Sequence, residues 1–192
     1  GPHRRVAAGD PPPARAATLG LGAAGACREA EPRATARARA RNSVVLIAAG
    51  NEAVPASRSS PGNCGGVITV AANNREGKRA DYSNYGQAVE ITAPGGGASA
   101  GDSILSTINA GSREPGHADY GWKSGTSMAT PQVAGAWAVL KQAAPTASVT
   151  NVLNALVTTG TPVTDTRSGA SGTITKPRIN VDAAAAVLTG AP

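Results

Sequence analysis

Short unbroken apolar runs recur along the chain from residue 43 onward. Residues 43–49 read Ser-Val-Val-Leu-Ile-Ala-Ala, and residues 66–72 read Gly-Val-Ile-Thr-Val-Ala-Ala. A third run covers residues 89–93 and is stopped by Pro94 and three glycines, and a short fourth covers residues 104–107. These runs lack the alternation of a half-exposed strand, so they predict parallel strands that are buried on both faces.

Three further segments have the spacing of helices. Residues 126–143 carry apolar side chains, Val139 among them, around most of their circumference, which predicts a long helix buried on most sides. Residues 148–158 predict an amphipathic surface helix, and the Ala-rich residues 180–188 predict a closing helix. Residues 120–123, Tyr-Gly-Trp-Lys, are expected to form an exposed strand or hairpin. Alternating strands and helices predict an α/β fold with a largely parallel sheet.

The bulk composition fits one globular domain. A chain of 192 residues is long enough to bury a core, and 41% hydrophobic residues with 24 glycines fit an α/β protein with many turns. No apolar run approaches the ~18 residues that span a bilayer, so we expect no membrane segment. The first five residues lack the apolar region of a signal peptide.

Positive charge is concentrated before residue 43. Residues 1–42 hold 8 Arg and 3 acidic residues, a balance of +5, which leaves +1 of the net charge of +6 for residues 43–192. The segment is rich in Ala, Arg and Pro and has no aromatic residue, so we expect it to be partly irregular. The same composition arises when a GC-rich gene is read in the wrong frame. A basic arm that binds nucleic acid is the alternative interpretation of this segment.

Ser127 stands at the start of the long predicted helix, among small residues. A serine in this place lies near backbone N–H groups without helical partners and near the positive end of the helix dipole. That setting suits a nucleophile whose attack creates an oxyanion, although an isolated serine here is more often a helix cap. Asn51 follows the first buried strand, where a Gly-Asn pair is by itself only a turn.

Two longer motifs surround these residues. Residues 124–131 read Ser-Gly-Thr-Ser-Met-Ala-Thr-Pro, and residues 48–51 read Ala-Ala-Gly-Asn. Together they resemble the two signatures in the C-terminal portion of the catalytic domain of subtilisin-like serine proteases, the subtilases. The resemblance covers residues 43–192, and residues 18–42 match it loosely. It implies a subtilisin-like α/β fold, a mainly parallel central sheet with helices on both sides, with the N-terminal part of the fold missing.

The resemblance also implies roles for the matched residues. Ser127 corresponds to the nucleophile that hydrolyses a peptide bond, and the side-chain amide of Asn51 to a donor of the oxyanion hole. Ala49 and Gly50 correspond to one wall of the pocket for the residue before the scissile bond. The other implied substrate-binding positions are Gly125, Thr126, Leu21 and Gly22, the last two within a strand that pairs with the substrate backbone.

Cys27 and Cys64 are the only cysteines of the chain. Two buried thiols are one interpretation. Their surroundings resemble positions that are paired in secreted bacterial subtilases, which implies a disulfide and an extracellular enzyme. The two cysteines and two lone histidines lack zinc-ligand spacing, so no metal site is predicted. The family often binds calcium, but no run of acidic ligands places such a site here.

Neither histidine matches the catalytic base of the family, which follows an Asp and precedes the Ser in the chain. His3 has no Asp before it and lies too near Asn51, and His117 lies only ten residues before Ser127 in a polar loop. Gln132 stands where the family usually has a His outside the triad. The sequence therefore predicts a serine endopeptidase that is truncated or misread and is inactive as given.

The alternative is a non-catalytic relative, a pseudo-protease that keeps a peptide-binding groove. In both cases we expect a polypeptide as the bound partner and a monomeric protein.

Overall fold

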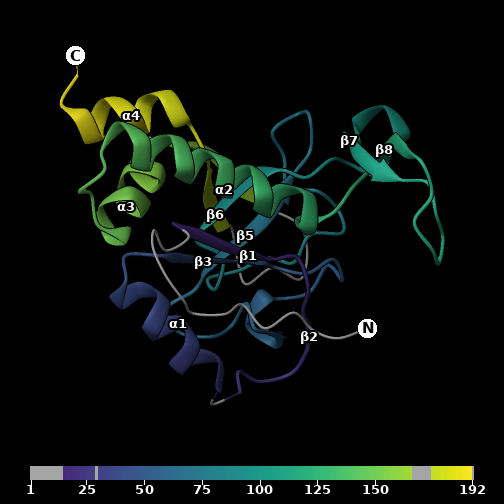
Figure 1. Cartoon of the computed structure of the whole chain (residues 1–192), viewed down its shortest axis with the longest axis horizontal. Coiled ribbons are helices and arrows are strands. Elements are labelled where there is room, and N and C mark those ends of the chain that lie inside the picture. The colour runs from purple at the N-terminus through teal and green to yellow at the C-terminus, as the bar shows by residue number, and fades with distance from the viewer. Residues whose placement is uncertain (1–14, 29, 166–173, 192) are drawn as a thin grey trace.

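A central sheet organises the computed structural model, which describes residues 15–28, 30–165 and 174–191. Within these residues six strands pair in the order β1-β3-β5-β6-β10-β9 (Figure 1). The pairs from β1 through β10 run parallel, and β10 pairs with β9 antiparallel at one edge. The strands are β1 (Ala16–Leu19), β3 (Val44–Ala48), β5 (Ile68–Asn73), β6 (Ile91–Pro94), β9 (Thr161–Asp165) and β10 (Ile174–Arg178). The prediction of a mainly parallel α/β sheet is confirmed.

Helices cover both faces of this sheet, as predicted (Figure 1). The helix α1 (Ala30–Ala40) lies on one side. The other side carries α2 (Thr126–Ala143), α3 (Val149–Thr159) and α4 (Val181–Thr189). The side chains of Ser148 and Asn180 cap α3 and α4 by accepting hydrogen bonds from N–H groups in their first turns. None of the described helices is long and apolar enough to cross a membrane.

The largest core lies between the sheet and α2. Leu46 and Ile68 are fully buried in the same cluster as Val133, Trp137 and Leu140 of α2; Val44, Val70 and Ile91 belong to it as well. The opposite face of the sheet buries a smaller cluster that includes Ile47, Cys64 and Val67. Burial on both faces explains why β3 and β5 have unbroken apolar sequences.

The long helix α2 begins and ends where the sequence predicts, but its burial is less complete. Pro131, Gly135 and Ala138 are exposed, and Val139 keeps 53% of its surface accessible. The prediction of burial on most sides is therefore wrong for this face, because α2 lies on the sheet as an outer layer with one side toward solvent.

A separate hairpin contains the fourth apolar run. Strand β7 (Ile104–Asn109) pairs antiparallel with β8 (Ala118–Lys123), outside the central sheet. Tyr120 and Trp122 of β8 are 70% and 59% exposed, which agrees with the expected exposed strand. Residues 104–107 were expected as a further parallel strand; this is wrong, because their backbone hydrogen bonds go to β8 instead. The hairpin projects from the body of the molecule (Figure 1).

The basic segment before residue 43 contains regular structure in its described part. β1 pairs with β3 from Ala16 to Leu19. The helix α1 has Glu31 in its first turn and Arg37 and Arg39 in its last. This placement of charges stabilises the helix, because each charge lies near the end of the helix dipole with the opposite sign. Thus the expected irregular segment is regular over these two elements, whereas residues 1–14 and 29 lie outside the described residues.

Cys27 and Cys64 form a disulfide, with Cα atoms 5.1 Å apart, which confirms the predicted pairing. The bond joins the segment before α1 to the loop between β4 (Ser59–Ser60) and β5. The short strand β2 (Ala23–Ala24) pairs with β4 beside it. The disulfide thus fixes the β2–β4 region against the sheet.

Removing this bond should destabilise the fold. The linked residues are 37 positions apart in the sequence. A chain-entropy estimate for a loop of this size gives a loss of about 3–4 kcal/mol in the double variant Cys27→Ala/Cys64→Ala. Urea unfolding of the variant and the oxidised wild type measures this loss. An unchanged unfolding midpoint would contradict it, and reduced wild type is the matched control.

Candidate active site

The side-chain oxygen of Asn51 joins the end of β3 to the start of α2. Asn51 Oδ1 accepts hydrogen bonds from the Thr126 backbone N–H at 2.9 Å and from the Thr126 hydroxyl at 3.0 Å. The Thr126 hydroxyl in turn accepts from the Gly50 N–H at 3.3 Å. Because a backbone N–H can only donate, these contacts require the oxygen of the amide to face Thr126. The Nδ2 amino group therefore points away from Thr126. Within the described residues, Asn51 forms its hydrogen bonds through its backbone N–H and Oδ1, and none through Nδ2.

Ser127 follows Thr126 in the first turn of α2. Its hydroxyl donates to the carbonyl oxygen of Gly20 at 2.8 Å, and a Cβ atom built on Gly20 would lie 3.3 Å from the Ser127 Cβ. The first N–H groups of a helix have no intrahelical acceptor, and the helix dipole adds positive potential there. The Asn51 amide and the N-terminus of α2 thus bring donors and a hydroxyl into one small region, as the sequence predicts.

A buried asparagine holds the turn that carries Asn51. Asn84 Oδ1 accepts from the backbone N–H groups of Glu52 and Val54, both at 3.1 Å. Its Nδ2 donates to the Ala49 carbonyl oxygen at 2.8 Å and to Glu52 Oε2 at 2.9 Å. Gly50 packs against this side chain at φ +104, which favours glycine.

Two glycines connect the start of α2 to the end of β6. The Gly125 N–H donates to the Gly95 carbonyl oxygen at 2.9 Å, and the Tyr82 hydroxyl lies 2.7 Å from the carbonyl oxygens of Gly95 and Gly96. Burial raises the pKa of Tyr82 to about 12, because the phenolate would lose hydration; Asp102 adds a smaller contribution in the same direction. The neutral phenol therefore supports the loop that precedes Ser127.

A cavity of about 600 Å³ lies beside the Asn51 turn. One side consists of the small residues Ala24, Gly25 and Ala26, and the other includes Glu52 and Arg58; Val54, Ser57 and Ser59 complete the lining. The Gly25 N–H donates to the Arg58 carbonyl oxygen at 2.9 Å, which joins the two sides. The small side chains leave room for a group that enters between them.

The structure places the remaining predicted substrate-binding residues around this region. Ala49 is fully buried and Gly50 half-buried, and neither lines the cavity. Gly125 and Thr126 are buried, and the Thr126 hydroxyl is bonded to Asn51. Leu21 is 65% exposed on the segment between β1 and β2. A Cβ atom built on Gly22, which shares that segment, would lie 3.1 Å from the Ser60 carbonyl oxygen. Their contacts with substrate stay predictions.

His117 is the one histidine within the described residues, since His3 lies outside them. It precedes β8 on the projecting hairpin, and its Nε2 lies 3.7 Å from Asp119 Oδ2. In this arrangement the imidazole of His117 lies beside Asp119, and the Ser127 hydroxyl donates to the Gly20 carbonyl. Gln132 donates to the Pro94 carbonyl oxygen at 2.6 Å and so ties α2 to β6.

Comparison with known proteins identifies the family. A model of the subtilase family (Peptidase S8) matches residues 11–174, and the chain belongs to this family. It is 44% identical over 135 residues to an extracellular protease of Xanthomonas campestris pv. campestris, covering 70% of this chain and 22% of the relative. It is 41% identical over 132 residues to an extracellular basic protease of Dichelobacter nodosus, covering 69% of this chain and 21% of that protein.

A solved structure shares the fold. The structure of a protease from Pseudoalteromonas arctica PAMC 21717 superposes with a TM-score of 0.81 at 39% identity, over 93% of this chain and 52% of that one. The chain thus spans about a fifth of the length of the two curated relatives and about half of this structure.

Sequence reasoning missed three residues that shape the site. Gly20 offers its carbonyl to Ser127, and Asn84 and Tyr82 fix the loops on either side of the Asn51–Thr126 contact. Gly20 lies in the stretch Leu-Gly-Leu-Gly, within residues 18–42 that match the family only loosely, and Tyr82 and Asn84 lie in an ordinary polar loop. No local pattern distinguishes them, because their partners are distant in the chain.

The tight packing around Gly50 can be tested by adding a side chain at this position. A Cβ atom there would lie 2.3 Å from Asn84 Nδ2 and 2.6 Å from Glu52 Oε2, at a φ that side chains avoid. Gly50→Ala should therefore lower the free energy of unfolding by about 1–3 kcal/mol. Gly65→Ala is the control, because nothing lies within 4 Å of its added Cβ. Equal urea midpoints for the two variants would contradict the packing.

The raised pKa of Tyr82 makes a second test. Since its folded-state pKa of about 12 exceeds the unfolded value of roughly 10, its contribution to stability is complete below pH 10 and is lost as the pH rises toward 12. Absorbance at 295 nm should show a late-titrating tyrosine that Tyr82→Phe removes. Loss of an early-titrating tyrosine in that variant would show that the phenol is not held neutral.

Proposed function

We propose that Ser127 is the nucleophile of a serine endopeptidase and that Asn51 is its oxyanion-hole donor. The observation that carries the proposal is the orientation of the Asn51 amide, whose oxygen is bonded to Thr126 next to Ser127. The Nδ2 group and the Ser127 N–H would both donate to the oxygen of the scissile carbonyl as negative charge develops on it. Membership of the subtilase family supports the same chemistry.

The proposed reaction begins with attack of Ser127 Oγ on the peptide carbonyl. The serine proton passes to a base, which then gives it to the leaving amine as the tetrahedral intermediate collapses to an acyl-enzyme. Water, losing a proton to the same base, then hydrolyses the ester and frees Ser127. In the described residues the Ser127 hydroxyl donates to a backbone carbonyl, which cannot take up a proton near neutral pH. We therefore propose that residues 1–192 alone lack competent activity, and that the base and its orienting carboxylate are supplied from outside the described residues.

The substrate in this proposal is a polypeptide. Its residue before the scissile bond would enter the cavity beside Glu52, and its backbone would run along the segment with Leu21 and Gly22. Ala49 and Gly50 would support the wall of this cavity from behind, through Asn84. The cavity lining carries both the Glu52 carboxylate and the Arg58 guanidinium, so its two formal charges are of opposite sign.

The cellular setting follows from the disulfide and the relatives. A disulfide persists in an oxidising compartment, and relatives of this chain are named extracellular proteases. We propose a secreted, monomeric protein. Calcium is the metal ion that membership of the family suggests, and nucleic acid is not a proposed partner.

The second candidate is a pseudo-protease that binds peptides without chemistry. The bond between Ser127 and the Gly20 carbonyl favours it, because no proton acceptor is in place there. The two candidates differ in whether an external base restores reactivity at Ser127.

Imidazole added to residues 1–192 tests this difference. We expect little modification of Ser127 by an activated ester or a fluorophosphonate alone, and a marked imidazole-dependent increase, measured by mass spectrometry of the Ser127 peptide. The Asn51→Asp variant keeps an oxygen toward Thr126 but removes the donor, and should react about 10²–10³-fold more slowly; the magnitude is that known for loss of such a donor in a subtilisin.

Two control variants complete the experiment. Ser127→Ala should abolish the modification, and His117→Ala should leave it unchanged. Peptide binding with no imidazole-dependent modification would favour the pseudo-protease. Modification without imidazole that His117→Ala abolishes would show that His117 is a base after all.

A further inference from the structure

Asn84 is a fully buried polar residue in the loop between β5 and β6. Besides the four contacts with Ala49, Glu52 and Val54, its Nδ2 lies 3.0 Å from Ser59 Oγ. Its own backbone N–H donates to the Gly50 carbonyl oxygen at 3.0 Å. A buried amide gains from such bonds only if all partners are correctly placed, so the loop geometry and the side-chain rotamer fix each other.

These partners belong to two parts of the site. Ala49, Gly50 and Glu52 flank Asn51, and Glu52 Oε2 also accepts from the Asn51 backbone N–H at 2.9 Å. Glu52, Val54 and Ser59 line the 600 Å³ cavity. The Asn84 side chain therefore forms hydrogen bonds both with the residues on either side of Asn51, the proposed oxyanion donor, and with residues that line the proposed substrate cavity.

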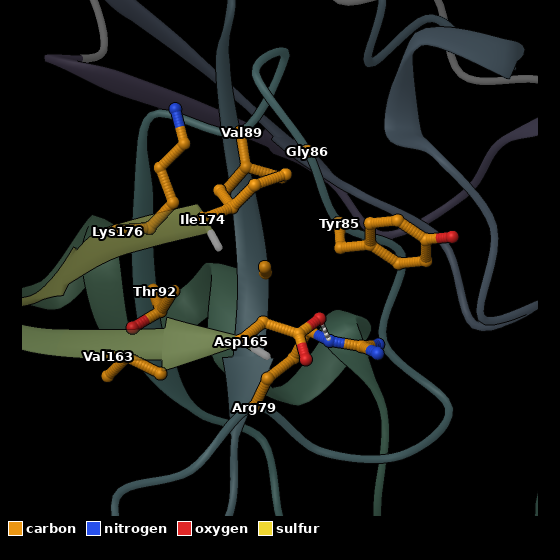
Figure 2. Close-up of a pocket in the computed structure, with 10 residues that line it drawn as sticks. Arg79, Tyr85, Gly86, Val89, Thr92, Val163, Asp165, Ile174 and Lys176 are labelled. Carbon is orange, nitrogen blue, oxygen red and sulfur yellow. Dashed lines mark hydrogen bonds and ion pairs between the residues drawn. The ribbon is translucent and has the colours of Figure 1, made fainter. Parts of the chain in front are cut away.

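Asn84 is itself held from behind by a buried ion pair. The Arg79 guanidinium donates to the carbonyl oxygen of Ser83, the residue before Asn84, and pairs with Asp165 of β9. Figure 2 shows this pair beside the ring of Tyr85, which lies 4.7 Å from the Arg79 guanidinium carbon. Both charged side chains are less than a tenth exposed, so the contact is shielded from water. The backbone that carries Asn84 is thus anchored to the far edge of the sheet.

We propose that Asn84 is a positioning residue that sets the orientation of the Asn51 amide and the shape of the adjoining cavity together. Its hydrogen bonds to the described residues go to neither Asn51 Nδ2 nor Ser127, so it acts through Glu52 and the backbone around Gly50. The functional meaning of this role rests on the proposed function, but the positioning itself can be measured without any reaction.

The Thr126 backbone N–H reports the position of Asn51. It belongs to the first residue of α2, where an N–H has no intrahelical acceptor, and its recorded acceptor is Asn51 Oδ1. Its protection from hydrogen exchange therefore depends on the Asn51 side chain staying in place. Protection expressed relative to the slowest amides of α2 cancels a general loss of stability.

The experiment compares hydrogen exchange by NMR in residues 1–192 and three variants. In Asn84→Ala we expect the relative protection of Thr126 N–H to fall roughly tenfold, the effect of losing about one hydrogen bond, and the Asn51 side-chain amide signals to move. In Glu52→Ala, which changes an exposed side chain, we expect a smaller fall of about threefold.

Asn42→Ala is the matched control. Asn42 Oδ1 accepts from the Val149 N–H at 3.0 Å, and Val149 is the first residue of α3, away from the site. This variant should lower the protection of Val149 and leave the relative protection of Thr126 unchanged. It therefore separates a specific effect of Asn84 from the general effect of removing a structural asparagine.

The outcomes test the positioning role of Asn84 separately from the proposed function. Unchanged relative protection of Thr126 in folded Asn84→Ala would overturn the positioning role, and so would an equal fall in Asn42→Ala. If Asn84→Ala does not fold, Glu52→Ala decides, and unchanged Thr126 protection there would overturn the role. Failure of imidazole-dependent modification in the wild type would reject the proposed function and leave the exchange result valid.

Discussion

The double hydrogen bond from Thr126 to Asn51 Oδ1 is the contact on which the site depends. It joins the carboxyl end of a buried strand to the amino end of a helix across 75 residues of sequence. A short polar bond of this kind is effective because both ends are rigid: β3 is packed on both faces, and α2 lies across the sheet. With the oxygen engaged, the amino group of the amide is the part left to meet a ligand.

The surrounding structure limits how far this contact can move. The Asn84 side chain and the space that Gly50 leaves for it define the turn after β3, and Gly95 with Tyr82 defines the approach to α2. Asn84 and Tyr82 both come from the segment between β5 and β6, and β5 lies next to β3 in the sheet. The geometry around Asn51 and Ser127 is therefore a property of neighbouring strands, and distortion of one loop is expected to change the position of Ser127.

The sequence predicts much of this arrangement and misses the rest for physical reasons. Buried strands such as residues 44–48 and the helix 126–143 follow from local apolar patterns. The edge strands are harder to predict: β1 has only four residues, and β9 contains Pro162, so pairing with neighbours decides their conformation. Ser127 and Asn51 are found through motifs, whereas Asn84 has partners up to 35 residues away and leaves no local signal.

The Asn51 amide is held with its oxygen on Thr126, which in the proposed mechanism leaves its amino group for the oxyanion. The most direct measurement is the scalar coupling through the hydrogen bond, between the Thr126 backbone nitrogen and the Asn51 side-chain carbonyl carbon, by NMR of the labelled protein. We expect an observable coupling that disappears in Asn51→Ala. A folded protein with a clear Thr126 signal and no such coupling would contradict it.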